Sequence, residues 1–107
     1  MCRYRDDETG LPRPSWDLWE ERSGIHAWTV GATWGGLQAA ANFVESFGEV
    51  DLAERYRRVA DEIKAGVREH LMSSQLGCFA RTINRKGDGT WEYDTTIDAS
   101  LIGLWYF

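Results

Sequence analysis

The sequence predicts an all-α fold in which an inner helix is covered by outer helices. Residues 27–47 have a helical apolar period without a charged face, residues 51–72 have one apolar stripe on a charged surface, and residues 98–107 begin a further apolar segment. A helix without a charged face needs neighbours on most sides, which implies two layers of helices. A two-helix hairpin cannot supply these neighbours, so we expect a large bundle or a double ring of helices, of which this chain is a part.

The composition argues against several classes of partner and cofactor. The formal net charge is -5, and we expect neither a nucleic-acid nor a membrane partner, because both require a clustered basic patch. Cys2 and Cys78 lie far apart, without the spacing of metal ligands, so we expect no disulfide framework, no metal and no cofactor. The N-terminus lacks the apolar segment of a signal peptide, so a cytoplasmic location is the default expectation.

The first part of the chain combines a loop with an uncharged segment. Residues 1–16 contain both prolines and a charged cluster, which favours an ordered loop. Residues 25–44 contain no Asp, Glu, Lys or Arg and are long enough to span a bilayer. However, His26, Gln38, Asn42 and three glycines make this segment much less hydrophobic than a membrane span. A helix buried within protein is the better interpretation.

The uncharged segment is expected to form a helix over residues 27–47. Its apolar residues recur at steps of three and four: Val30, Trp34, Leu37, Ala41 and Val44. Gly31, Gly35 and Gly36 each cost about 1 kcal/mol of helix propensity relative to alanine. A closely packed neighbour or a ligand is therefore expected beside them. Gly48 suits the C-terminal end of the helix.

A second helix, with one apolar face, is predicted over residues 51–72. Asp51 followed by Glu54 resembles an N-cap with its capping-box partner. The apolar stripe that follows consists of Leu52, Tyr56, Val59, Ile63, Val67 and Leu71. The remaining surface is rich in charged residues, as expected of an outer helix with one solvated face.

A small hairpin and a third helix are predicted at the end of the chain. Residues 78–83 and 90–93 flank "NRKGDG", a turn-rich segment, which favours a β-hairpin. Asp98 can cap a helix that begins the apolar run ending at Phe107. Because a finished domain usually ends in a polar terminus, we expect a fragment, or a run that another subunit covers.

Acidic and aromatic residues gather in one stretch, "PSWDLWEERSGIH". Asp17, Glu20 and Glu21 would share one side of any helical turn. Carboxyl groups crowded beside indoles tend to have raised pKa values, and a carboxyl group that stays protonated can act as a proton donor. Trp16 and Trp19 offer flat apolar faces with an N–H at the edge, which suit a sugar ring. A glycosidase is therefore one hypothesis for this stretch.

The alternative is a structural role for the same residues. Carboxylates just before a helix often stabilise its N-terminal end, and spacing alone favours this capping interpretation. His26 is expected to start the helix with its hydrogen bonds satisfied rather than to bind a ligand. Three further tryptophans are expected in the core, because they lie in apolar helices: Trp28, Trp34 and Trp105.

Bacterial members of glycoside hydrolase family 15, the glucoamylase family, resemble this chain in "GLPRPSWDLWEERSGIHAWTVGATWGGLQAAA". The similarity continues through "LAERYRRVADEIKAGVREHL" and "DTTIDASLIGLW", so it covers nearly the whole chain. "DLWEE" followed by a small-residue helix is its fairly specific part. The resemblance implies a partial catalytic domain over residues 1–107, truncated at both ends. It also implies that the chain is a segment of an (α/α)6 barrel, a toroid of inner and outer helices.

The resemblance also implies an activity and assigns roles to residues. Family members hydrolyse α-glucosidic bonds with inversion and release glucose from the non-reducing ends of oligosaccharides or polysaccharides, and some act on trehalose or dextran-type linkages. Glu20 matches the general acid of the family, Glu21 a residue that hydrogen-bonds substrate hydroxyls, and Asp17 an acidic residue that supports the site. Trp16 matches an aromatic position that lines the site, and Trp19 is expected to shape the pocket wall.

The general base of the family corresponds to a position beyond Phe107. Inversion requires two carboxyl groups about 6.5 to 9.5 Å apart with a water between them. Glu20 and Glu21 are adjacent in sequence and cannot flank a sugar from opposite faces. We therefore expect this chain alone to lack glucoamylase turnover. A non-catalytic sugar-binding module and a purely structural helical module stay as alternatives.

Overall fold

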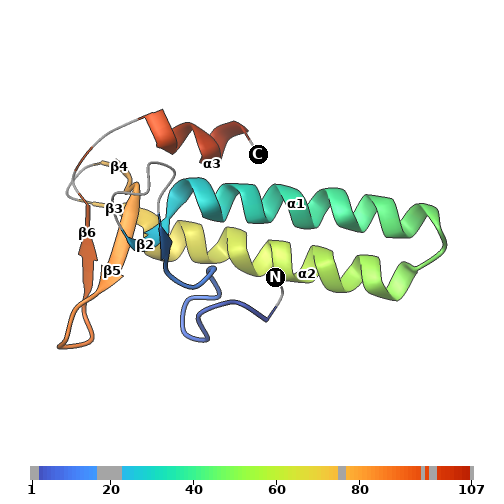
Figure 1. The fold of residues 1–107 in the computed structure, drawn as a ribbon, viewed down its shortest axis with the longest axis horizontal. Helices are drawn as coiled ribbons and strands as arrows, with labels where there is room; N and C mark the ends of the chain where they lie inside the picture. Colours follow the sequence, from blue (N-terminus) through green and yellow to red (C-terminus); the bar gives the residue numbers. More distant parts are fainter. Residues whose placement is uncertain (1–2, 17–22, 75–76, 95, 97–98, 107) are drawn as a thin grey trace.

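A computed structural model describes residues 3–16, 23–74, 77–94, 96 and 99–106. Two antiparallel helices, α1 (Ala27–Ser46) and α2 (Val50–Gly66), pack side by side along the long axis of the molecule (Figure 1). A small sheet lies at the end where α1 begins, and the short helix α3 (Gly103–Tyr106) packs on the side of α1 away from α2 (Figure 1). α1 is therefore the central helix of the described chain.

The first predicted helix is confirmed, but its burial is more one-sided than expected. The buried residues of α1 are Ala27, Val30, Gly31, Thr33, Leu37 and Ala41. On the opposite side Gly36, Ala39 and Phe43 are exposed. Gly48 follows the helix as predicted, because its φ of 83° lies in the left-handed region and its N–H donates to the Glu45 carbonyl oxygen at 2.9 Å.

The second predicted helix is also confirmed, although it begins differently. α2 continues into a π-helical turn at Val67–Leu71, so the helical segment ends close to the predicted residue 72. Val59 and Ile63 of the predicted stripe are buried. The predicted capping box is wrong, because Glu49 is the N-cap residue and no side chain caps the first turn. Asp51 lies within that turn, where its charge is favourable toward the positive end of the helix dipole.

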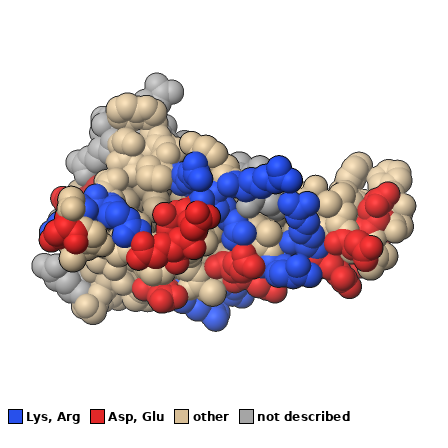
Figure 2. All heavy atoms as spheres, turned by 90° about the horizontal axis from the view of Figure 1, so that it is seen from below, with Lys and Arg blue, Asp and Glu red and all other residues tan. Residues whose placement is uncertain are grey.

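Charged side chains gather on the solvated side of α2 and on the N-terminal loop. Arg57 pairs with Glu45 at 2.5 Å, and Arg5 pairs with Glu62 at 2.7 Å. Figure 2 views the molecule from this side, and basic and acidic side chains are interspersed there. This surface has the character predicted for an outer helix.

The all-α prediction is too narrow, because an antiparallel sheet with the order β1-β2-β5-β6 lies at one end of the helices. A separate pair consists of β3 and β4. The strands have these bounds: β1 Ser15–Trp16, β2 Ser23–His26, β3 Met72–Ser73, β4 Cys78–Phe79, β5 Thr82–Arg85 and β6 Trp91–Tyr93. The predicted hairpin is confirmed as β5 and β6, whereas β1 and β2 were not predicted. Strands this short depend on their pairing partners more than on their own sequence.

The core lies where the sheet meets the helices. Its largest fully buried side chains are Leu11, Val30, Ile63, Leu71 and Ile83. The N-terminal loop reaches this core by packing directly on α2. A β-carbon at Gly66 would lie 2.5 Å from the Thr9 carbonyl oxygen, so this approach requires a residue without a side chain.

The last described segment differs in part from its prediction. A 3-10 turn at Ala99–Ile102 leads into α3, and the predicted cap Asp98 lies outside the described residues. Trp34 packs against the core as expected, but Trp105 is 82% exposed because no described segment covers it. Within the described ranges, no helix has both the length and the hydrophobicity to cross a bilayer.

Candidate functional site

The predicted acid-bearing segment connects β1 to β2. Ser15 pairs with Gly24 and Trp16 pairs with Ser23, so the sequence DLWEER at 17–22 joins two antiparallel strands. Four predicted site residues lie outside the described residues: Asp17, Trp19, Glu20 and Glu21. Trp16 is the predicted site residue whose position the structure describes.

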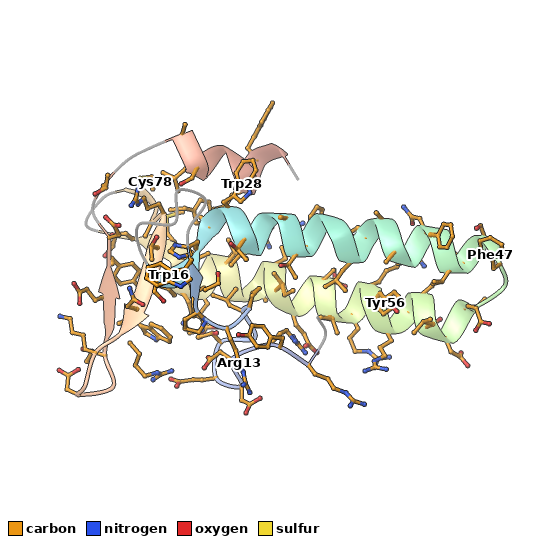
Figure 3. The ribbon with its side chains drawn as sticks, in the orientation of Figure 1. Arg13, Trp16, Trp28, Phe47, Tyr56 and Cys78 are labelled. Carbon is orange, nitrogen blue, oxygen red and sulfur yellow. The ribbon has the colours of Figure 1, made fainter. Side chains whose placement is uncertain are left out.

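Trp16 presents an exposed indole at the sheet end of the molecule. It lies on β1, an edge strand, and is 65% exposed. Figure 3 shows its side chain near β2 and the start of α1. An indole that is open to solvent offers an apolar face and an N–H donor at its edge, the combination that suits a sugar ring.

β2 separates the acidic segment from α1. The helix begins at Ala27 with His26 as its N-cap residue, and its first turn contains no acidic residue. The Ala27 N–H donates instead to the Arg81 carbonyl oxygen at 2.8 Å. The strand β2 therefore stands in the sequence between the acids of DLWEE and the first turn of α1, and the capping interpretation stays open, because these acids lie outside the described residues.

His26 starts the helix with both ring nitrogens hydrogen-bonded, as predicted. The imidazole is buried, with Nδ1 2.7 Å from Thr82 Oγ1 and Nε2 2.8 Å from the Ser15 carbonyl oxygen. A carbonyl oxygen can only accept, so Nε2 carries the proton and Nδ1 of the neutral ring accepts from the Thr82 hydroxyl. One side chain of β2 thus contacts both β1 and β5.

A buried ion pair supports the same end of α1. Arg81 Nε donates to Asp94 Oδ2 at 3.0 Å, and both residues are largely buried. The Asp94 N–H donates to the Thr82 carbonyl oxygen at 2.9 Å. Sequence reasoning missed this pair. The signal was the position of the two residues: Arg81 directly precedes β5 and Asp94 directly follows β6, so the pairing of these strands brings them together.

A broad hollow lies beside α1 and is closed in part by Arg3 of the N-terminal loop and by Arg55 and Tyr56 of α2. Its α1 lining consists of Trp28, Thr29, Ala32, Thr33, Gly36, Leu37 and Ala40. A β-carbon at Gly36 would meet no atom within 4 Å, so the close neighbour predicted for Gly36 is not among the described residues. In the described part of the chain, no three His, Cys, Asp or Glu side chains gather as metal ligands would.

Comparison with known proteins identifies the family. The family described as glycosyl hydrolases family 15 matches residues 9–104. The chain belongs to glycosyl hydrolase family 15. This membership confirms the resemblance seen in DLWEE and the helix that follows it.

Two proteins with known names are similar to this chain in sequence. An uncharacterized glycosyl hydrolase of Methanocaldococcus jannaschii is 33% identical over 93 residues, which cover 87% of this chain and 14% of that protein. The trehalase of Mycobacterium tuberculosis is 34% identical over 91 residues, which cover 83% of this chain and 12% of that protein. This family 15 chain therefore spans only a small part of the length of these relatives. No solved structure matches it significantly.

Proposed function

We propose that this chain is part of the catalytic domain of an inverting, exo-acting α-glucoside hydrolase. The observation that carries the proposal is the sequence DLWEE between β1 and β2, directly after the exposed indole of Trp16. Membership of family 15 supports glycoside hydrolysis as the class of reaction. The substrate class we propose is α-linked gluco-oligosaccharide or polysaccharide, from whose non-reducing end glucose is released.

The architecture we propose for the longer domain is an (α/α)6 barrel. In such a barrel α1 is an inner helix and α2 an outer helix. Support comes from the uncharged exposed side of α1 and the charged exposed side of α2. The sheet at the start of α1 would then lie at one end of the barrel, where the connections between helices can form a substrate site.

The proposed reaction uses two carboxyl groups on opposite sides of the sugar. Glu20 donates a proton to the glycosidic oxygen as its bond to the anomeric carbon breaks. A general base that we assign outside residues 1–107 removes a proton from the water that attacks the opposite face. Glu21 hydrogen-bonds substrate hydroxyls and Asp17 supports the site, while Trp16 and Trp19 line it.

The full-length protein that carries this chain provides the test of the general acid. We expect Glu20→Gln to lower kcat on maltose and starch about 100- to 10,000-fold, because the leaving oxygen then has no positioned proton donor. The rate of hydrolysis of α-glucosyl fluoride should change much less, because fluoride is a good leaving group that departs without a proton from the general acid. Glu54→Gln makes the same chemical change at an exposed position of α2 and should leave both rates unchanged.

Two outcomes of these assays count against the proposal. Near-normal hydrolysis of maltose by Glu20→Gln would exclude Glu20 as the general acid. Binding of maltose in calorimetric titration, with no hydrolysis of any α-glucoside by the wild type, would support the non-catalytic sugar-binding module instead. Inversion is tested separately by NMR, since the glucose first released from an α-glucoside must be the β-anomer.

Trehalose is a second candidate substrate, favoured by one specific observation. The trehalase of Mycobacterium tuberculosis is 34% identical to this chain over 91 residues. Both substrates use the same general acid, so the Glu20 assignment is unaffected by the choice. Values of kcat/KM for trehalose, maltose and dextran, measured side by side, decide between the specificities.

A further inference from the structure

We propose that His26 is a positioning residue for Trp16, the indole that we assign to the substrate site. The proposal rests on the proposed function, because it takes Trp16 as a substrate contact. His26 is 3% exposed, and both of its ring nitrogens are used within the sheet. Its contact with β1 is made to the Ser15 carbonyl oxygen at 2.8 Å.

This contact acts on the peptide unit that leads into Trp16. The Ser15 carbonyl group and the Trp16 N–H belong to one planar peptide. A hydrogen bond that fixes the carbonyl direction therefore also restricts the backbone from which the indole projects. His26 thus influences the direction of the Trp16 side chain without touching the substrate.

β1 needs this support because it is a short edge strand. It contains two residues and pairs with β2 alone in the sheet order β1-β2-β5-β6. A pairing of this length supplies few ladder hydrogen bonds and is marginal on its own. The imidazole, itself buried, adds a part-buried hydrogen bond from β2 to the same strand.

Thr82 fixes the other side of the imidazole ring. Its Oγ1 lies 2.7 Å from Nδ1, while the Ser15 carbonyl oxygen, which can only accept, requires the proton on Nε2. Thr82 is itself buried, and its methyl group packs against Gly24. A β-carbon at Gly24 would lie 2.5 Å from Thr82 Cγ2, so the glycine permits this close approach of β2 and β5.

Two substitutions of similar shape isolate the donor on Nε2. In the full-length protein, His26→Gln keeps an amide N–H near the position of Nε2, whereas His26→Met has a similar length without a donor. We expect the Met variant to raise KM for maltose about five- to tenfold with a smaller change in kcat. We expect the Gln variant to restore KM to within about threefold of wild type. Equal KM values in the two variants would overturn the proposal.

A double-mutant cycle with Trp16→Ala distinguishes positioning from a general loss of stability. If His26 acts through Trp16, adding His26→Met to Trp16→Ala should raise KM no further, because the positioned group is already gone. Additive increases in KM would overturn the proposal. Val59→Ala is the control for stability: it removes buried side-chain atoms from α2, leaves both hydrogen bonds of His26 in place, and should lower Tm while changing KM less than His26→Met does.

Hydrogen exchange tests the contact without any assay of activity. Backbone amides of residues 15–16 and 23–24 should exchange faster in His26→Met than in His26→Gln. Unchanged exchange in an active enzyme overturns this inference and leaves the proposed function intact. An inactive wild type with faster exchange in the Met variant instead overturns the proposed function, and with it the role toward substrate. If His26→Met does not fold, His26→Asn replaces it, because its amide can still bond Thr82 but is too short to reach Ser15.

Discussion

α1 and α2 pack against each other and have similar lengths, but their exposed surfaces differ in chemical character. α1 has 20 residues, and Glu45 near its end is its one charged residue. The side of α1 away from the core exposes Gly36, Ala39 and Phe43. The corresponding side of α2 consists largely of charged residues that are in contact with water. Charged side chains suit a helix whose exposed face stays in solvent, whereas an exposed face of small and aromatic residues suits packing against protein.

The largest effect is expected where the two helices share the core. Ile63 of α2 is fully buried, so Ile63→Ala should lower the free energy of unfolding by about 2 to 5 kcal/mol. Phe43→Ala removes a larger side chain from α1, but Phe43 is 65% exposed and the loss should stay below about 1 kcal/mol. Urea-induced unfolding of the two variants measures the contrast. Equal losses would contradict the one-sided burial of α1.

Two glycines, one in each helix, sharpen the comparison. Replacing them by alanine should change stability by less than Ile63→Ala does, and in opposite directions in the two helices. At Gly66 of α2, an added β-carbon meets the Thr9 carbonyl oxygen at 2.5 Å, so Gly66→Ala should destabilise this chain by about 1 to 3 kcal/mol. At Gly36 of α1 the added atom meets nothing within 4 Å. Gly36→Ala should therefore stabilise the same 107 residues by about 0.5 to 1 kcal/mol through helix propensity.

Thermal unfolding of both glycine variants tests these opposite signs. A loss of Tm in Gly36→Ala within this chain would contradict the open space seen beside α1. Measured in the full-length protein, the same substitution also tests the proposed barrel. There Gly36→Ala should lower Tm if the exposed side of α1 packs against another helix, as we propose for an inner helix.

The sequence predicted the two long helices well because their patterns are local. The apolar stripe of α2 and the left-handed glycine at position 48 depend on residues within a few turns of one another, and both were confirmed. The strands before α1 were not predicted, since β1 and β2 contain few residues and β2 pairs with β5, more than 50 positions later. Pairing over that distance leaves no periodicity in the sequence around His26.

The candidate site shows a similar division between pattern and geometry. The assignment of residues 17–21 to the candidate site came from the sequence DLWEE and its resemblance to family 15. Membership of the family confirms that resemblance. The roles of Asp17, Glu20 and Glu21 stay predictions, because these residues lie outside the described part of the chain. The link from His26 to Ser15 and Thr82 could not be predicted from spacing. It requires the strand register that brings residues 15, 26 and 82 together.

The smallest effect on stability is expected from the ion pair that links the two helices. Arg57 of α2 donates to the Glu45 carboxylate of α1 at 2.5 Å, and this hydrogen bond lowers the pKa of Glu45 below its usual value. A depressed carboxyl pKa adds stability above the unfolded-state value near 4.5, and this stability is lost as the pH falls through the folded-state pKa. The wild type should therefore lose more unfolding free energy than Glu45→Gln as the pH falls below about 4.5. Both groups are exposed, so the difference should be small and should shrink further in high salt.

Urea unfolding at pH 6 and pH 3.5, with Glu92→Gln as an exposed control on β6, provides the measurement. Identical pH dependence in wild type and Glu45→Gln would show that the ion pair between Arg57 of α2 and Glu45 of α1 does not contribute to stability.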